Sequence, residues 1–267
     1  MHTRRAPLLA IGGAEDKFRD RLILRKFVEL AGGEQARISI LPTASGLRDA
    51  GLRYQAIFEE FGAEVAQVLP VRTREDAERD EYARTIGTST GIFMTGGNQI
   101  RISAILGGSL VGQALLRRSQ EGAVVAGTSA GASVMTTIMV AGGDGGRSPS
   151  ADLARMAPGL GLIDDVIIDQ HFRERDRVAR LMTMVSYNPG LLGLGIDEDT
   201  AALINPDGCI EILGAGTVLI VDGRNMVSNV HSRRGGTPLN VANATVHFLT
   251  SGSRYDITSR TAYLSTR

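Results

Sequence analysis

The amino-acid sequence predicts an α/β protein with a doubly wound, mostly parallel sheet and a β-rich C-terminal section. Three observations lead to this prediction. Apolar runs of strand length alternate with stretches of helical spacing through the first half of the 267 residues. Those runs are continuously apolar, as expected for parallel strands that are covered on both faces. In the last quarter of the chain, short β-like runs alternate with turns, which indicates hairpins.

The individual elements are predicted in chain order. Buried strands are expected at 7–11, 38–42, 65–69, 91–94, 123–126, 166–168 and 191–196. Helices are expected at 17–30, 50–61, 75–85, 100–106 and 110–121, from residue 130, and at 173–185. The helix 17–30 depends on the helical spacing of its apolar side chains. Because no repeat, low-complexity tract or clear linker interrupts the sequence, a single α/β domain spanning residues 1–267 is expected.

Composition and charge exclude several functions. Lysine plus arginine and aspartate plus glutamate both number 29, so the net charge is near zero and nucleic acid is not an expected partner. No apolar segment approaches membrane-spanning length, so no membrane association is expected. Cys209 is the only cysteine, which fits a soluble protein of the reducing cytoplasm. No metal and no cofactor are predicted, because clustered metal ligands are lacking and GGAED lacks the third glycine of a dinucleotide motif.

The motif with the clearest chemistry is G-x-S-x-G around Ser129, in the stretch VVAGTSAGASVM. An apolar run precedes it and a helix-compatible run follows, which favours a nucleophile on a strand-to-helix turn. Such a turn is strained and accepts only very small neighbours, as Gly127, Ala130 and Gly131 are. The alternative is an ordinary tight turn with an incidental serine.

A serine nucleophile needs a base, and the chain has only four histidines. His2 lies at the terminus, and His231 and His247 lie in the hairpin-rich tail. His171 directly follows the predicted strand VIID. Because ligands bind at the carboxyl ends of parallel strands, His171 is the best candidate for the base. A structural histidine is the alternative.

An acid should orient the imidazole of the base. The segment GIDEDT offers Asp197, Glu198 and Asp199, and Asp169 is a fourth option. The residues alone do not choose among them. In every case the chain order is serine, histidine, acid, whereas α/β-hydrolases have serine, acid, histidine. This difference argues against an ordinary esterase or lipase.

Four predicted strands end in small and polar residues, in GGAED, TAS, TGGNQ and GTSAG. The carboxyl ends of parallel strands lie at one edge of the sheet, so these ends should converge on one crevice. The backbone N–H groups of Gly97 and Ala130 are the expected donors to a tetrahedral oxyanion. A glycine turn without a catalytic role is the alternative at Gly97.

Seven segments together resemble a known family of serine peptidases, that of cyanophycinase and its relative peptidase E, an aspartyl dipeptidase. They are IGGAEDK, LPTAS, TGGNQxRI, GTSAGAS, MAPGLGLI, DQHFxERxRxxRL and GIDEDTA, in order over most of the chain. The DQHF and MAPGLGL segments are more similar to cyanophycinase. The resemblance implies a flavodoxin-like, class I glutamine-amidotransferase-like fold and a cytoplasmic homodimer. The chain departs from the family at Ala14, where glycine is expected, and in the glycine-rich loop 141–147.

The resemblance implies roles for individual residues. Ser129 would be the nucleophile, His171 the base and Glu198 the orienting acid. The residues implied to line the substrate pocket are Gln99, Asp169, Gln170, Arg175, Arg177 and Arg180. The implied substrate is cyanophycin, a polyaspartate backbone that carries an arginine on each β-carboxyl group, and the implied products are β-Asp-Arg dipeptides. The expected single domain would thus be hydrolytic.

The basic segment 173–185 agrees with such a substrate, because arginines bind carboxylates in bidentate fashion. On a helix, Arg173, Arg177 and Arg180 would share a face and Arg175 would point away. A solvated charged helix is the alternative.

Other functions stay open. A peptidase E-like dipeptidase that acts on aspartyl or isoaspartyl peptides is the nearest, and a non-catalytic binding module of the same fold is another. Glutamine-amidotransferase chemistry is disfavoured, because it uses a cysteine at the elbow and Cys209 lies far from it in the sequence.

Overall fold

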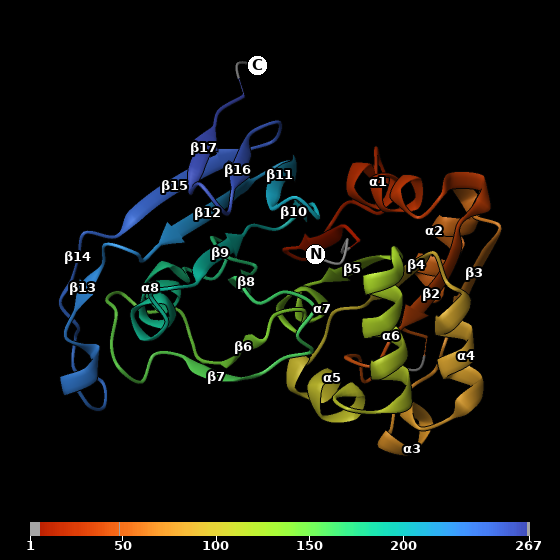
Figure 1. Ribbon diagram of the computed structural model, residues 1–267, viewed down its shortest axis with the longest axis horizontal. Coiled ribbons are helices and arrows are strands. Elements are labelled where there is room, and N and C mark those ends of the chain that lie inside the picture. Colours follow the sequence, from red (N-terminus) through yellow and green to blue (C-terminus); the bar gives the residue numbers. More distant parts are fainter. Residues whose placement is uncertain (1–5, 48, 266–267) are drawn as a thin grey trace.

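The computed structural model describes residues 6–47 and 49–265, so His2 lies outside the described residues. A nine-stranded sheet forms the larger part (Figure 1). Across the sheet its strands are β17 (Thr261–Tyr263), β16 (Arg254–Asp256), β11 (Cys209–Gly214), β10 (Thr200–Ile204), β1 (Leu8–Ile11), β5 (Val124–Thr128), β4 (Gly91–Met94), β2 (Arg37–Leu41) and β3 (Val65–Val68). The five strands from β1 to β3 are parallel, and those from β10 to β17 pair antiparallel.

The parallel strands are buried on both faces. In β1, the side chains of Leu9 and Ile11 pack with α1 (Leu22–Leu30) and α2 (Leu52–Glu60). The helices on the opposite side are α3 (Arg74–Ala77), α4 (Asp80–Thr88), α5 (Gln99–Leu106) and α6 (Leu110–Glu121). The side chains of Leu8 and Ala10 belong to one core with side chains of α4, α5 and α6. Helices on both faces explain the continuously apolar strands, and the predicted doubly wound sheet is confirmed.

A second sheet of four strands lies beside the first (Figure 1). In order across this sheet they are β15 (Thr245–Thr250), β12 (Thr217–Asp222), β9 (Leu192–Ile196) and β8 (Val166–Gln170). Only β8 and β9 are parallel. The remaining elements are η1 (Gly33–Gln35), α7 (Ala130–Ser133), β6 (Ile138–Gly142), β7 (Arg155–Pro158), α8 (Val178–Tyr187), β13 (Val227–Ser228), η2 (Val230–Ser232) and β14 (Val241–Ala242).

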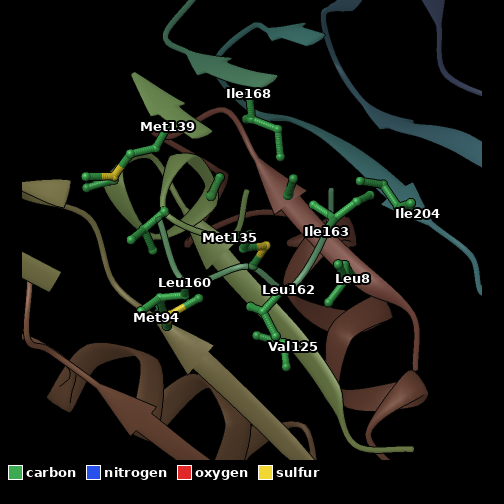
Figure 2. Close-up of a cluster of buried hydrophobic side chains, with 14 of the residues drawn as sticks. Leu8, Met94, Val125, Met135, Met139, Leu160, Leu162, Ile163, Ile168 and Ile204 are labelled. Carbon is green, nitrogen blue, oxygen red and sulfur yellow. The ribbon is translucent and has the colours of Figure 1, made fainter. Parts of the chain in front are cut away.

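The two sheets share one hydrophobic core. Figure 2 shows Leu8, Val125 and Ile204 of the large sheet near Leu162 and Ile163. The same cluster includes side chains of all four strands of the second sheet. The other face of the second sheet packs against α8, where Leu219 and Val221 share a hydrophobic cluster with Leu181 and Val185. The elements of the C-terminal half are therefore joined to the parallel sheet by continuous apolar packing.

Three predicted helices differ in the structure. Helix α1 begins at Leu22 rather than at residue 17, because the Asp16 carboxylate accepts the backbone N–H groups of Phe18, Arg19 and Arg21. The predicted helix 75–85 is split into α3 and α4. Helix α8 begins at Val178 and not at residue 173.

The late start of α8 has a local cause. Asp176 has a φ of 48°, in the left-handed region, and residues 172–176 form turns instead. Gly145 packs against the carbonyl groups of this segment so closely that a Cβ atom would overlap them. The predicted helical face of Arg173, Arg177 and Arg180 is therefore wrong.

Strand β10 and the hairpin of β6 and β7 are absent from the predicted elements. Strand β10 matters for the site, because it lies beside β1 and follows the acidic segment 197–199. Among the described helices, no single one is long and apolar enough to cross a membrane. The pair of α5 and α6 passes that test together, by length and composition only, and is bent by 98°.

Candidate active site

The G-x-S-x-G segment forms a sharp turn between β5 and the single turn of α7. Ser129 lies at this turn with a φ of 54° and a ψ of −111°, a strained conformation for a residue other than glycine. Its N–H donates to the carbonyl of Ile11, at 2.9 Å, which ties the turn to β1. Gly127 and Gly131 pack backbone against backbone, so that a Cβ atom on Gly127 would overlap the Gly131 carbonyl. The small residues of the motif allow this geometry.

His171 directly follows β8 and is also held in the left-handed region, with a φ of 46°. Its N–H donates to the carbonyl of Gly12 at 2.8 Å. The imidazole ring lies against Gly13, which has a φ of 105° and where a Cβ atom would overlap the ring. Gly13 was not among the predicted site residues. The glycine pair at the end of the first strand is the signal that points to it.

Ser129, His171 and Glu198 form one hydrogen-bonded chain. The Oγ atom of Ser129 lies 2.8 Å from Nε2 of His171, and Nδ1 of His171 lies 2.6 Å from Oε1 of Glu198. The imidazole side chain is 13% exposed and the Glu198 side chain 37%. The imidazole of His171 is therefore held in a mostly buried position, and the carboxylate of Glu198 is open to solvent.

The other three candidate acids have other partners. Asp197 accepts hydrogen bonds from the N–H and hydroxyl of Thr217, at 3.0 and 2.7 Å. Asp199 accepts the N–H of Asp16 at 2.8 Å. Asp169 lies on β8, and its carboxylate contacts arginines. Of these four acids, only Glu198 is hydrogen-bonded to the imidazole of His171.

The predicted oxyanion donors, Gly97 and Ala130, come from two different turns. Ala130 follows Ser129 at the start of α7, and Gly97 comes from the TGGNQ turn. A Cβ atom built on the neighbouring Gly96 would lie 3.4 Å from Cβ of Ser129, so this turn runs alongside the serine. Asn98 caps α5 by accepting the N–H groups of its first turn, and its own N–H donates to Ala44. Two of the four polar strand ends, TAS and TGGNQ, are therefore bonded together.

A buried ionic cluster lies at the end of β8. Asp169 is fully buried and accepts two hydrogen bonds from Arg180, one of them from Nε to Oδ2 at 2.8 Å. Arg177 donates to the carbonyl and, at 2.9 Å, to the side-chain oxygen of Gln170. The exposed fractions of Arg177 and Arg180 are 8% and 2%. Four of the six predicted pocket residues therefore contact one another.

Burial has a chemical effect on Arg177. Loss of solvent lowers the pKa of its guanidinium to about 10, and the neighbouring Asp169 carboxylate opposes this shift. Within the part of the chain that the structure describes, its Nε is buried without a hydrogen-bond partner. A buried N–H group of a cation without an acceptor costs free energy. An anionic group within hydrogen-bond distance of this Nε would therefore be stabilised.

The other two predicted pocket residues are Gln99 and Arg175. Gln99 opens α5 and donates to the carbonyl of Val140 at 2.8 Å. Arg175 is exposed on the turn before α8. Arg180 also donates to the carbonyl of Gly143, so the glycine-rich loop 141–147 is tied to the arginine cluster.

His231 and His247 lie on η2 and β15, in the β-rich tail, and neither is hydrogen-bonded to Ser129. No group of three or more histidine, cysteine, aspartate or glutamate side chains among the described residues could hold a metal ion. The side chains that meet at the elbow supply a hydroxyl, an imidazole and a carboxylate.

This constellation is that of a serine hydrolase, and comparison with known proteins defines the class further. The model of peptidase family S51 matches residues 8–212. The chain therefore belongs to peptidase family S51, a family of serine peptidases. The matched range includes the elbow, His171 and Glu198.

Two cyanophycinases resemble this chain over nearly its whole length. That of Geminocystis herdmanii is 45% identical over 255 residues, covering 94% of each chain. That of Trichormus variabilis is 43% identical over 259 residues, covering 95% of this chain and 86% of the relative.

Solved structures support the fold. A peptidase from an acI-B1 actinobacterium superposes with a TM-score of 0.70 at 20% identity, covering 96% of this chain and 98% of the other. A putative peptidase E protein from Listeria monocytogenes gives a TM-score of 0.54 at 15% identity, covering 79% of this chain and all of the other.

Proposed function

We propose that this protein is a serine-type exopeptidase that hydrolyses cyanophycin to β-Asp-Arg dipeptides. The observation that carries the proposal is the hydrogen-bonded chain from Ser129 through His171 to Glu198, in a protein similar to cyanophycinases. The proposed reaction cleaves the α-peptide bond between two backbone aspartates.

In the proposed mechanism, the Oγ atom of Ser129 attacks the scissile carbonyl while Nε2 of His171 takes its proton. Glu198 holds the Nδ1–H tautomer of His171 and stabilises the imidazolium. The N–H groups of Gly97 and Ala130 donate to the oxyanion. The imidazolium then protonates the leaving amine. Water, deprotonated by the same imidazole, then attacks the acyl carbonyl, and the imidazolium returns this proton to Oγ of Ser129 as the acyl–oxygen bond breaks.

The ionic cluster at the end of β8 supports a substrate with carboxylates. Each arginine of cyanophycin carries a free α-carboxylate and a guanidinium, and Arg175 and Arg177 are the proposed partners of the carboxylate. Asp169 and Arg180 hold each other, so their proposed contribution is to fix Arg177 and Gln170 at the pocket wall. Gln99 is proposed to contact the substrate from α5.

The second candidate is a dipeptidase for aspartyl or isoaspartyl peptides. The observation that favours it is the similar fold of the putative peptidase E protein. Rates with short α-Asp dipeptides and with soluble cyanophycin separate the two functions. The primary proposal predicts a far higher kcat/KM for the polymer.

The test of the primary proposal is product analysis by mass spectrometry after incubation with cyanophycin. The wild type should release β-Asp-Arg, and Ser129→Ala should release none while it stays folded by circular dichroism. Near wild-type turnover by Ser129→Ala would show that the serine is not the nucleophile. Release of arginine alone would show that a different bond is cleaved.

We also propose that the chain folds as a single α/β hydrolytic domain and works as a cytoplasmic homodimer. The shared core of the two sheets supports one domain. The single cysteine supports a reducing compartment. Sedimentation equilibrium tests the homodimer, and a monomer at micromolar concentration would contradict it.

A further inference from the structure

We propose that Glu15 is a positioning residue of the active site, which acts on Ser129 through Thr128. This inference rests on the proposed role of Ser129. It concerns the GGAED segment, which the catalytic chain itself does not use. The side chain of Glu15 is 1% exposed, so its carboxylate is shielded from bulk solvent.

Both oxygens of the Glu15 carboxylate are engaged. Oε1 accepts the hydroxyl of Tyr54 at 2.5 Å and lies 2.9 Å from Nζ of Lys17. Oε2 accepts the hydroxyl of Thr128, also at 2.5 Å. Burial raises the pKa of the Tyr54 hydroxyl, and the neighbouring carboxylate raises it further, so Tyr54 remains a donor. A buried charge is tolerated only with such partners, and here one partner immediately precedes the nucleophile.

The segment that carries Glu15 also contacts His171 and the residue that follows Glu198. The carbonyl of Gly12 accepts the N–H of His171 at 2.8 Å, and Gly13 packs against its ring. The carbonyl of Gly13 accepts the N–H of Asp199, the residue after Glu198, at 2.9 Å. The loop after β1 therefore touches all three segments of the catalytic chain, and the Glu15 carboxylate joins this loop to the elbow.

The strained conformation of Ser129 explains why such an anchor is useful. A left-handed residue at a turn can relax to an ordinary conformation unless neighbouring contacts oppose it. A shift of the serine of about 1 Å can reduce the rate about 100-fold, because Oγ, the imidazole and the carbonyl must be aligned. Thr128 is the last residue of β5, and its hydroxyl fixes the chain directly before the turn.

The test compares two variants on the path to the elbow with two matched controls. Glu15→Gln removes the charge, and Thr128→Val removes only the hydroxyl with little change of shape. Tyr54→Phe removes the other hydroxyl on the same carboxylate. Ser39→Ala removes a buried bond to Ser89 of 2.8 Å in the middle of β2.

Three quantities are measured for each variant: the rate at which a fluorophosphonate labels Ser129, kcat and KM with cyanophycin, and the unfolding midpoint in urea. Glu15→Gln and Thr128→Val should each reduce labelling and kcat by about 10- to 100-fold with KM little changed. The double variant Glu15→Gln/Thr128→Val should be labelled no more slowly than the slower of the two single variants, because both act through the same hydrogen bond. Tyr54→Phe and Ser39→Ala should lower stability and keep labelling close to the wild-type rate.

The proposal is overturned if Thr128→Val lowers stability but the folded variant is labelled at the wild-type rate. It is also overturned if Tyr54→Phe slows labelling as much as Thr128→Val does. Thr128→Val decides the matter if Glu15→Gln does not fold. If wild-type Ser129 is labelled and no dipeptide is released, the proposed substrate is wrong, and the labelling rates still decide the role of Glu15.

Discussion

At the scale of single residues, the site is built on backbone conformations that residues other than glycine rarely adopt. Ser129, His171 and Asp199 all have positive φ, of 54°, 46° and 46°. The chemistry of the site could be predicted from residue types and their place after strands. Which acid meets His171 could not, because three adjacent acids differ only in the turn that directs each side chain. The family resemblance, and not the spacing, selected Glu198.

The pair of Glu198 and Asp197 separates catalysis from stability. Glu198→Gln should lower kcat by about 10³- to 10⁴-fold with little change in unfolding, because an amide favours the wrong tautomer of His171. Asp197→Asn should lower the free energy of unfolding by about 1–3 kcal/mol, because Asp197 is buried and bonded to Thr217. Steady-state kinetics and urea titrations of both variants check this. The reverse pattern would assign the orienting role to Asp197.

Ala14, where the family resemblance led us to expect glycine, also lies in the left-handed region, with a φ of 47°. Relief of strain of about 1–2 kcal/mol should outweigh the flexibility cost of glycine, about 0.5–1 kcal/mol. Ala14→Gly should therefore raise the free energy of unfolding by about 0.5–1 kcal/mol. Ala31→Gly, at an ordinary φ of −75°, is the control and should destabilise. Equal destabilisation by both would argue against strain at residue 14.

At the scale of elements, the sequence predicted the parallel strands well and the helix starts poorly. Strand positions follow from apolar runs between turn residues, as at β4, where the predicted bounds match. Helix starts at 17 and 173 were wrong because both segments are bonded locally. Asp16 accepts the N–H groups that a helix would use, and Asp176 turns the chain before Val178.

The Asp16 turn should depend on pH. Backbone N–H groups, those of Arg21, Phe18 and Arg19 foremost, lower the pKa of Asp16 from 3.8 to about 2. A lowered pKa means that the turn is stabilised above about pH 4 and loses this stabilisation as the pH falls through 2. NMR titration should report the low pKa, and amides 18–21 should exchange faster at pH 2 than the pH dependence of intrinsic exchange explains. An unshifted Asp16 would contradict the turn.

At the scale of the whole molecule, the β-rich C-terminal section is not an appendage of hairpins. Its strands form a second sheet and extend the first, and both sheets contribute to one core (Figure 2). The sequence predicted strands in this region without their partners. Strand pairing between β1 and β10, nearly 200 residues apart, depends on packing that no local pattern encodes.

The shared core predicts cooperative unfolding of both sheets. Ile168→Ala, in β8, removes a fully buried side chain of this core and should cost about 2–5 kcal/mol. Phe248→Ala, in β15, is the control, because that side chain is 63% exposed and should change stability by less than about 0.5 kcal/mol. In native-state hydrogen exchange, amides of β4 and β12 should share the same highest protection. Two separate unfolding transitions would mean two domains.

The role of Ser129 as nucleophile is tested by labelling the wild type with a fluorophosphonate and mapping the adduct by mass spectrometry. We predict one adduct per chain, on the peptide that contains Ser129, and the loss of this adduct in His171→Ala. An active enzyme in which the reagent leaves Ser129 unlabelled would contradict the assignment of Ser129 as nucleophile. So would a label at another residue that abolishes cyanophycin hydrolysis.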